Sequence, residues 1–214
     1  MLIKKSLGLW LVIFLFTLCY MGATGQTTWT VAYNKPNVKV ETKYYKNTKI
    51  KTFRLTAMVT NHTMDEFYNL LLDVNKMGDW YDKINRIDVL KETSNTDAVY
   101  AIIYDMPFPF EDRMCTVKAT IEYYKSTQKI YVKTNHINYP LSKIEAKKYA
   151  SMSRVEGLDS YWSISKNTNG TISLIHEGYM NPGGNITASM VNMGIEYGPV
   201  KTLESMLKIL PKYK

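Results

Sequence analysis

Few of the side chains that commonly perform catalysis are grouped in this sequence. His62, His136 and His176 are its three histidines, and long stretches of chain separate them. His176 and Glu177 are adjacent in a strand-like segment, so their side chains are expected on opposite faces and cannot form one site. The patterns His-Glu-x-x-His, Gly-x-Ser-x-Gly and Cys-x-x-Cys are absent, as is a phosphate loop. The sequence therefore predicts no catalytic residue, no metal site and no cofactor.

The segment PFPFEDRMCTV, residues 107–117, contains the most unusual group of polar residues. Two prolines end a strand, Glu111, Asp112 and Arg113 follow, and another strand begins at once. Arg113 could orient the polar headgroup of a ligand, or it could pair with a carboxylate and fix the turn. We expect this turn at the mouth of a cavity whose wall is the next strand.

Small and apolar residues alternate with polar ones in the strand after this turn. Cys115, Val117 and Ala119 are expected on one face, with Thr116 and Lys118 on the other. Small inward side chains leave space, and an empty apolar space destabilises a protein by about 24 cal/mol per Å³, so it should hold ligand or water. Cys115 is the one cysteine beyond the first 25 residues, and its pattern is typical of a small buried hydrophobic residue.

Helical periodicity occurs in two regions. Thr63 and Glu66 form a capping-box pattern, and apolar residues at three- and four-residue intervals predict a helix from about Met64 to Val74, followed by a short helical turn, KMGDWYDKI. Residues 186–210 carry one long apolar face and predict a C-terminal helix bent at Gly198-Pro199. The residues of this helix that we expect to face a ligand are Met190, Val191 and Gly194.

The rest of the chain has the pattern of β-strands joined by short polar turns. Strand-like segments occupy residues 29–59, and six more strands lie between residues 84 and 181, the last two joined by a hairpin turn at Asn169-Gly170. Short connections favour an antiparallel meander. The predicted class is α+β, a curved antiparallel sheet wrapped around the long C-terminal helix, with one or two short helices after the N-terminal strands.

Four features, in order along the chain, resemble the START family, the lipid-transfer domains related to the steroidogenic acute regulatory protein. They are Trp80-Tyr81-Asp82 after the first helix, the turn Pro107-Phe108-Pro109-Phe110-Glu111-Asp112-Arg113, the turn Asn181-Pro182-Gly183-Gly184, and Val191-Asn192 followed by Pro199 and Leu203. The resemblance covers roughly residues 29–210 and implies the helix-grip fold. The sequence departs from the family at Met114, where an aspartate is usual, and at Thr187, where a proline is usual.

The resemblance implies a lipid or sterol-like ligand held in an internal cavity, for transfer or sensing and without catalysis. Since the family keeps the turn arginine with ligands of different kinds, we favour a structural role for Arg113. The cavity arginine of some sterol-binding members would fall on Ala119, so no anchor for a sterol hydroxyl can be carried over. The predicted ligand-binding residues are Tyr104, Phe108, Phe110, Arg113, Cys115, Val117, Ala119, Met190, Val191 and Gly194.

Two alternatives stay open from the sequence. One is a cyclase- or hydrolase-type enzyme that uses the same pocket, with His176, Tyr104 or Tyr179 as proton-transfer groups. The other is an interaction module whose cavity is vestigial and filled by its own aromatic side chains. Inward-facing proton-transfer groups would favour the enzyme, and a filled cavity would favour the interaction module.

The first 25 residues have the pattern of a signal peptide, with Lys4 and Lys5 before an uncharged run and small residues at its end. We expect an exported protein, periplasmic or secreted, with a START-like lipid-binding domain at residues 26–214; an uncleaved membrane anchor is the alternative. Removal of residues 1–25 would lower the formal charge from +8 to about +6. The lysines are scattered, so we expect no nucleic-acid partner, a transient membrane-surface contact at most, and a monomer.

Overall fold

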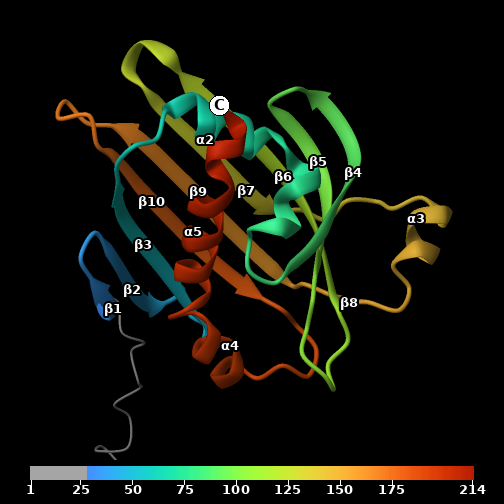
Figure 1. The fold of residues 1–214 in the computed structure, drawn as a ribbon. Helices are drawn as coiled ribbons and strands as arrows, with labels where there is room; N and C mark the ends of the chain where they lie inside the picture. The colour runs from blue at the N-terminus through green and yellow to red at the C-terminus, as the bar shows by residue number, and fades with distance from the viewer. Residues whose placement is uncertain (1–27) are drawn as a thin grey trace, which may run out of the picture.

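The computed structural model describes residues 28–214 and shows one strongly curved sheet with helices on its concave side (Figure 1). The sheet has ten strands in the order β1-β2-β3-β10-β9-β7-β6-β5-β4, each antiparallel to its neighbours, and β8 pairs with β6 in parallel. The strands are β1 (Thr30–Lys35), β2 (Val38–Tyr44), β3 (Lys51–Val59), β4 (Ile84–Ser94), β5 (Asp97–Tyr104), β6 (Arg113–Tyr124), β7 (Lys129–His136), β8 (Ser153–Arg154), β9 (Gly157–Lys166) and β10 (Ile172–Asn181). The predicted signal segment lies outside the described residues.

The helices are short. Most of them cover the concave face and the two ends of the sheet, while Tyr149, at the end of α3, packs with Ala101 and Ile103 on the other face. Figure 1 shows α5 crossing the sheet in front of β10, β9 and β7, with α4 at one end and α2 at the other. None of the helices within residues 28–214 is long and apolar enough to cross a membrane. The helices are α2 (Met64–Leu72), η1 (Val74–Asp79), η2 (Lys125–Thr127), α3 (Lys143–Lys148), α4 (Ala188–Gly194), α5 (Gly198–Ile209) and η3 (Leu210–Tyr213).

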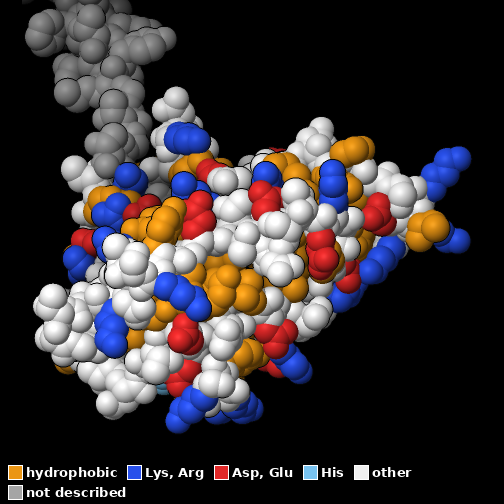
Figure 2. All heavy atoms as spheres, turned by 90° about the horizontal axis from the view of Figure 1, so that it is seen from above, with side chains coloured by type: hydrophobic (Ala, Val, Ile, Leu, Met, Phe, Trp, Pro, Cys, Tyr) orange, Lys and Arg blue, Asp and Glu red, His pale blue; other side chains and the backbone are white. Residues whose placement is uncertain are grey.

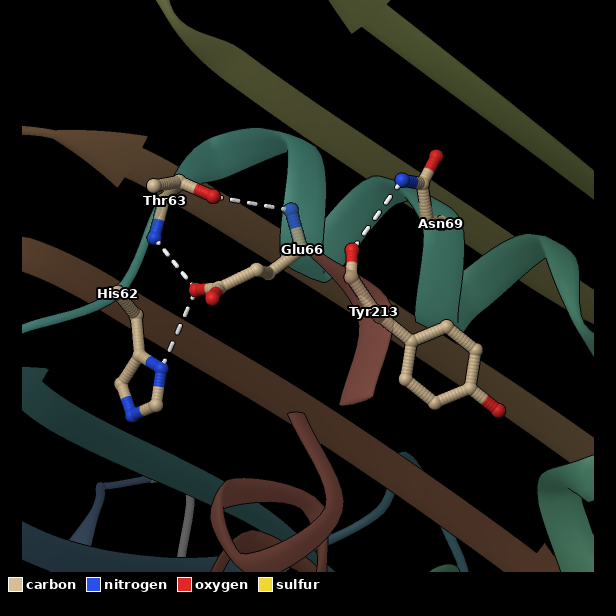
Figure 3. A network of polar contacts seen from close by, with 5 residues as sticks. All are labelled: His62, Thr63, Glu66, Asn69 and Tyr213. Atoms are coloured by element: carbon tan, nitrogen blue, oxygen red, sulfur yellow. Dashed lines mark hydrogen bonds and ion pairs between the residues drawn. The ribbon is translucent and has the colours of Figure 1, made fainter. Parts of the chain in front are cut away.

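A reciprocal cap starts α2, as the sequence predicts (Figure 3). The Thr63 hydroxyl accepts a hydrogen bond from the Glu66 amide at 3.2 Å, and the Glu66 carboxylate accepts one from the Thr63 amide at 2.8 Å. At the same end His62 Nδ1 lies 3.3 Å from the Glu66 carboxylate. Asn69 donates to the Tyr213 carbonyl at 3.3 Å, so α2 also holds the end of the chain. These bonds satisfy free amide groups of the first helical turn and fix where α2 begins.

The main hydrophobic core lies between the sheet and the helices α2 and α5. Leu55 of β3, Phe67 of α2, Trp162 of β9 and Leu203 of α5 are buried there in one cluster. A second cluster, around Ile102 of β5, fills the opposite half of the sheet. The amphipathic α5 therefore buries its apolar stripe against the sheet, which is the packing that the sequence pattern predicts.

The C-terminal region differs in detail from the sequence prediction. The predicted helix over residues 186–210 is two helices, because the chain leaves α-helical structure between Gly194 and Gly198. Pro199 stands in the first turn of α5, where a missing amide donor does no harm. The N-terminal strands join the later ones in a single sheet, because β10 returns to pair with β3.

Candidate functional site

A cavity of about 450 Å³ lies between the concave face of the sheet and the segments that cover it. Its wall is contributed by strands β3, β4, β5, β6, β7, β9 and β10, by the end of α2 and the chain around η1, and by α4 and the start of α5. Most of the lining side chains are hydrophobic. Representative wall residues are Phe53, Trp80, Ile102, Val117, Trp162, Met180 and Ile195.

The cavity exists where inward-facing residues of the sheet are small. Val117 and Ala119 of β6 lie on the wall, as the alternation after the charged turn predicts. Gly178 of β10 has the same effect, because a Cβ atom there would lie 2.5 Å from the Phe53 ring. Because Gly178 has no side chain, the Phe53 ring can pack closely against β10 and form part of the wall.

Two segments form one end of the cavity. Met106, Pro107 and Phe110 come from the β5–β6 turn, while Ile186 and Met190 come from the chain that leads into α4. Figure 1 places this turn and α4 at the same end of the molecule. The charged turn is thus beside the cavity, in agreement with the interpretation of its sequence.

Most of the predicted ligand-binding residues lie on this wall. They are Tyr104, Phe110, Val117, Ala119, Met190, Val191 and Gly194. Their contact with a ligand stays a prediction. Phe108, Arg113 and Cys115 do not lie on the wall, each for a different reason.

Arg113 is buried and connects two turns instead of facing the cavity. Its Nε donates to the Pro182 carbonyl at 3.0 Å, one Nη donates to the Glu111 carbonyl, and the other lies 3.5 Å from the Asn185 side-chain oxygen. The favoured structural role therefore agrees with the geometry, but the partners are carbonyl and amide oxygens instead of a carboxylate. The Asp112 carboxylate accepts from the Met106 amide at 3.1 Å, so the charged triplet holds the turn together.

Cys115 and Phe108 do not line the cavity for opposite reasons, since Cys115 is buried in packed structure and Phe108 is exposed to solvent. Cys115 shares a face with Val117 but is buried in a packed cluster with Ile102 and Val155, and it does not line the cavity. Burial raises the pKa of its thiol to about 12, so the thiolate is not available at neutral pH. Phe108 is 97% exposed at the tip of the turn, where strand alternation no longer decides the direction of a side chain.

A polar group interrupts the apolar wall. His176 Nε2 lies 3.1 Å from the Tyr81 hydroxyl and 3.3 Å from the Ser160 hydroxyl, and all three residues line the cavity. The imidazole stacks on Trp162 with ring centres 3.8 Å apart. Burial lowers the pKa of His176 to about 3, so its ring is neutral at physiological pH.

The sequence indicates His176 as a proton-transfer candidate, but no pattern in it indicates Tyr81 or Ser160 as its neighbours. Strand alternation carries part of the signal, since Ser160 and Trp162 share one face of β9 and His176 lies opposite Trp162 on β10. Tyr81 comes from the loop after η1, and no local pattern links it to β10. Only the assembled fold brings these groups together.

No protein-family model matches the sequence, and no curated protein sequence matches it. Solved structures do share its fold. The STAR-related lipid transfer protein of Xanthomonas axonopodis has a TM-score of 0.70 at 19% identity, over 86% of this chain and 98% of that one. Human STARD10 has a TM-score of 0.71 at 14% identity, over 86% of this chain and 74% of that one. Human StAR-related lipid transfer protein 5 has a TM-score of 0.71 at 11% identity, over 96% of each chain.

Proposed function

We propose that this chain, which has the helix-grip fold of StAR-related lipid transfer domains, binds a hydrophobic small molecule in its cavity and transfers or senses it without catalysis. The observation that carries the proposal is the cavity of about 450 Å³ with a mostly hydrophobic wall. The solved structures with the same fold are named as lipid transfer proteins, which supports a lipid as the ligand class.

The size of the cavity supports a bound ligand on energetic grounds. An empty apolar space of this size, if made by deleting side chains, would destabilise the fold by on the order of 10 kcal/mol. That figure approaches the whole stability of a typical domain, roughly 5–15 kcal/mol. A lipid that buries roughly 400 Å² of apolar surface gains about 10 kcal/mol before ordering is subtracted, which suffices for micromolar binding. An open space of about 450 Å³ also counts against the alternative of a vestigial cavity filled by aromatic side chains.

The protonation states of the wall residues favour binding over catalysis. A general base works best with a pKa near the operating pH, and burial holds the pKa of His176 at about 3. Burial raises the pKa of Tyr104 well above its usual value, that of Tyr81 to about 12, and that of Tyr179 as well, so these phenols are weak acids. The cyclase- or hydrolase-type alternative therefore lacks proton-transfer groups of suitable pKa at these positions.

Ligand exchange requires the cavity to open, and α4 is the segment we propose to move. Met190, Val191 and Gly194 of this helix line the cavity, while no residue of the connection between β7 and β8 does. Asn192 fastens α4 to the sheet by accepting from the Lys51 amide at 2.8 Å and donating to the Lys49 carbonyl at 3.0 Å. Breaking these two bonds would release α4 without disturbing α5.

A transient contact with a membrane surface would accompany exchange. Phe108 and Met193 are 97% and 68% exposed, and they lie in the two segments that form one end of the cavity. Apolar side chains at the mouth could enter the lipid interface while the cavity is open. Figure 2 shows the opposite end of the molecule, where lysine and arginine side chains are scattered among acidic ones.

The proposal includes the localisation of the protein, which we base on the pattern of residues 1–25. With a signal peptide at residues 1–25, the protein acts in the periplasm or outside the cell as a monomer. N-terminal sequencing of the protein purified from its own host tests this part, and an intact N-terminus would support the membrane-anchored alternative.

Native mass spectrometry of the protein purified from its own host tests the proposed function. We expect a population heavier than the polypeptide by one hydrophobic molecule, which organic extraction removes and identifies. A bare polypeptide mass, together with no uptake of lipid from vesicles, would contradict the proposal. A matched preparation of the Ala119→Phe variant, in which the cavity is partly filled, should carry less of the molecule.

A further inference from the structure

We propose that Tyr81, Ser160 and His176 form a hydrogen-bonding anchor in the cavity that selects a hydrophobic ligand ending in a hydroxyl group. This inference rests on the proposed function and deepens it by naming the polar chemistry of the ligand. The anchor occupies a different part of the wall from Ala119, at which the family resemblance would have placed a cavity arginine.

Three separate segments bring the anchor together. Tyr81 follows η1, Ser160 is on β9 and His176 is on β10, and each side chain lines the cavity. His176 Nε2 is 3.1 Å from the Tyr81 hydroxyl and 3.3 Å from the Ser160 hydroxyl. Aromatic rings surround the group, with Trp162 stacked on the imidazole and Phe53 edge-on to it at 4.8 Å. Its position is therefore fixed by packing, as a binding group requires.

The anchor has more hydrogen-bonding capacity than its own members use. Each hydroxyl offers one donor and two acceptor sites, while neutral imidazole Nε2 offers one donor or one acceptor. If Nε2 accepts from Tyr81, the Ser160 hydroxyl and several oxygen lone pairs stay available. If Nε2 donates, both hydroxyl protons stay available. In either tautomer the group can both accept and donate, which is the capacity that an alcohol matches.

Two other polar atoms near the anchor also have unused hydrogen-bonding capacity. His176 Nδ1 and Trp80 Nε1 are buried, and neither has a hydrogen-bond partner within residues 28–214. Both residues line the cavity and are almost completely buried, at 1% and 2% exposure. Buried polar atoms are normally paired, so these two atoms mark unused hydrogen-bonding capacity beside the anchor.

The charge of the wall disfavours a carboxylate at this position. The imidazole is neutral, so it gives an anion no ion pair. The charged residues that line the cavity carry more negative than positive charge; they are Asp82, Lys83, Asp105 and Asp159. Burying an unpaired carboxylate is costly, whereas an alcohol hydroxyl needs only the hydrogen bonds that the anchor offers.

A matched set of three ligands tests the anchor. Dodecanol carries a hydroxyl, its isomer methyl undecyl ether has the same atoms without a donor, and dodecanoate carries a charge. Each would displace a fluorescent naphthylamine dye from the purified, delipidated full chain. We expect dodecanol to bind most tightly. Tyr81→Phe and Ser160→Ala should each weaken dodecanol about threefold to tenfold, the effect of one hydrogen bond, and weaken the ether less, because the ether oxygen can only accept.

Tyr100→Phe is the control, because Tyr100 lines the same cavity outside the anchor. It should leave the preference for dodecanol over the ether unchanged. Equal binding of alcohol and ether to the wild-type chain, or equal effects of Tyr81→Phe and Tyr100→Phe, would overturn the anchor while leaving the cavity proposal intact. If none of the three ligands displaces the dye, the proposed function itself fails.

Discussion

Filling the cavity from its wall should stabilise the ligand-free protein. Ala119 faces the cavity from β6, so the larger ring of Ala119→Phe can enter existing space. Burying a phenylalanine side chain gains about 1.5–3 kcal/mol relative to exposure, and we expect about 1–2 kcal/mol of net stabilisation after the ring is ordered. For a protein of this size that corresponds to a rise in Tm of about 2–8 °C.

Ala101→Phe is the matched control on the neighbouring strand β5. Ala101 is fully buried in a packed cluster and does not line the cavity, so overpacking should destabilise the fold by about 1–3 kcal/mol. Thermal unfolding of the delipidated proteins, followed by circular dichroism, gives both values. Dye titration should show that Ala119→Phe also weakens hydrophobic ligand binding. A loss of stability in Ala119→Phe as large as that in Ala101→Phe would mean that the interior is packed, and would refute the reasoning.

Three further outcomes follow from the contacts around the cavity. Arg113→Ala leaves two carbonyl oxygens without their donor and should destabilise the fold by about 2–4 kcal/mol in urea unfolding, whereas Arg86→Ala, at an exposed ion pair, should change it by less than about 1 kcal/mol. Asn192→Ala should speed lipid exchange between vesicles and raise hydrogen exchange in α4, and unchanged rates would count against α4 as the moving segment. Because the pKa of His176 falls from 6.5 to about 3 on folding, its neutral form stabilises the protein above pH 6.5. That contribution is lost as the pH falls toward 3, by up to about 1.4 kcal/mol per pH unit. In the His176→Phe variant the free energy of unfolding should therefore fall less steeply with decreasing pH over this range.

The parts of the fold that depend on neighbouring residues could be predicted from the sequence. The cap of α2 needs only Thr63 and Glu66, three residues apart, and the β9–β10 hairpin needs a short turn containing Gly170, whose φ is +84°. Strand alternation likewise gave the wall position of Val117 and Ala119. These are local rules, and the structure follows them.

The remaining features depend on contacts between distant segments. Cys115 shares a face with Val117, but whether that face meets a cavity or a packed cluster depends on Val155, which lies far along the chain. The pairing of β3 with β10 and the contact between Tyr81 and His176 likewise arise only when separate segments meet. Periodicity assigns a residue to a face, but it does not say what covers that face.

Photo-crosslinking with a lipid analogue that carries a diazirine at the end of its chain tests most directly whether the ligand lies inside the protein. We expect labelled peptides from the inward face of β6, at Val117 and Ala119, and from α4, at Val191, and an excess of unlabelled lipid should abolish the labelling. Labels confined to outward residues such as Lys118, or labelling that unlabelled lipid does not reduce, would contradict a ligand held between the sheet and the C-terminal helices.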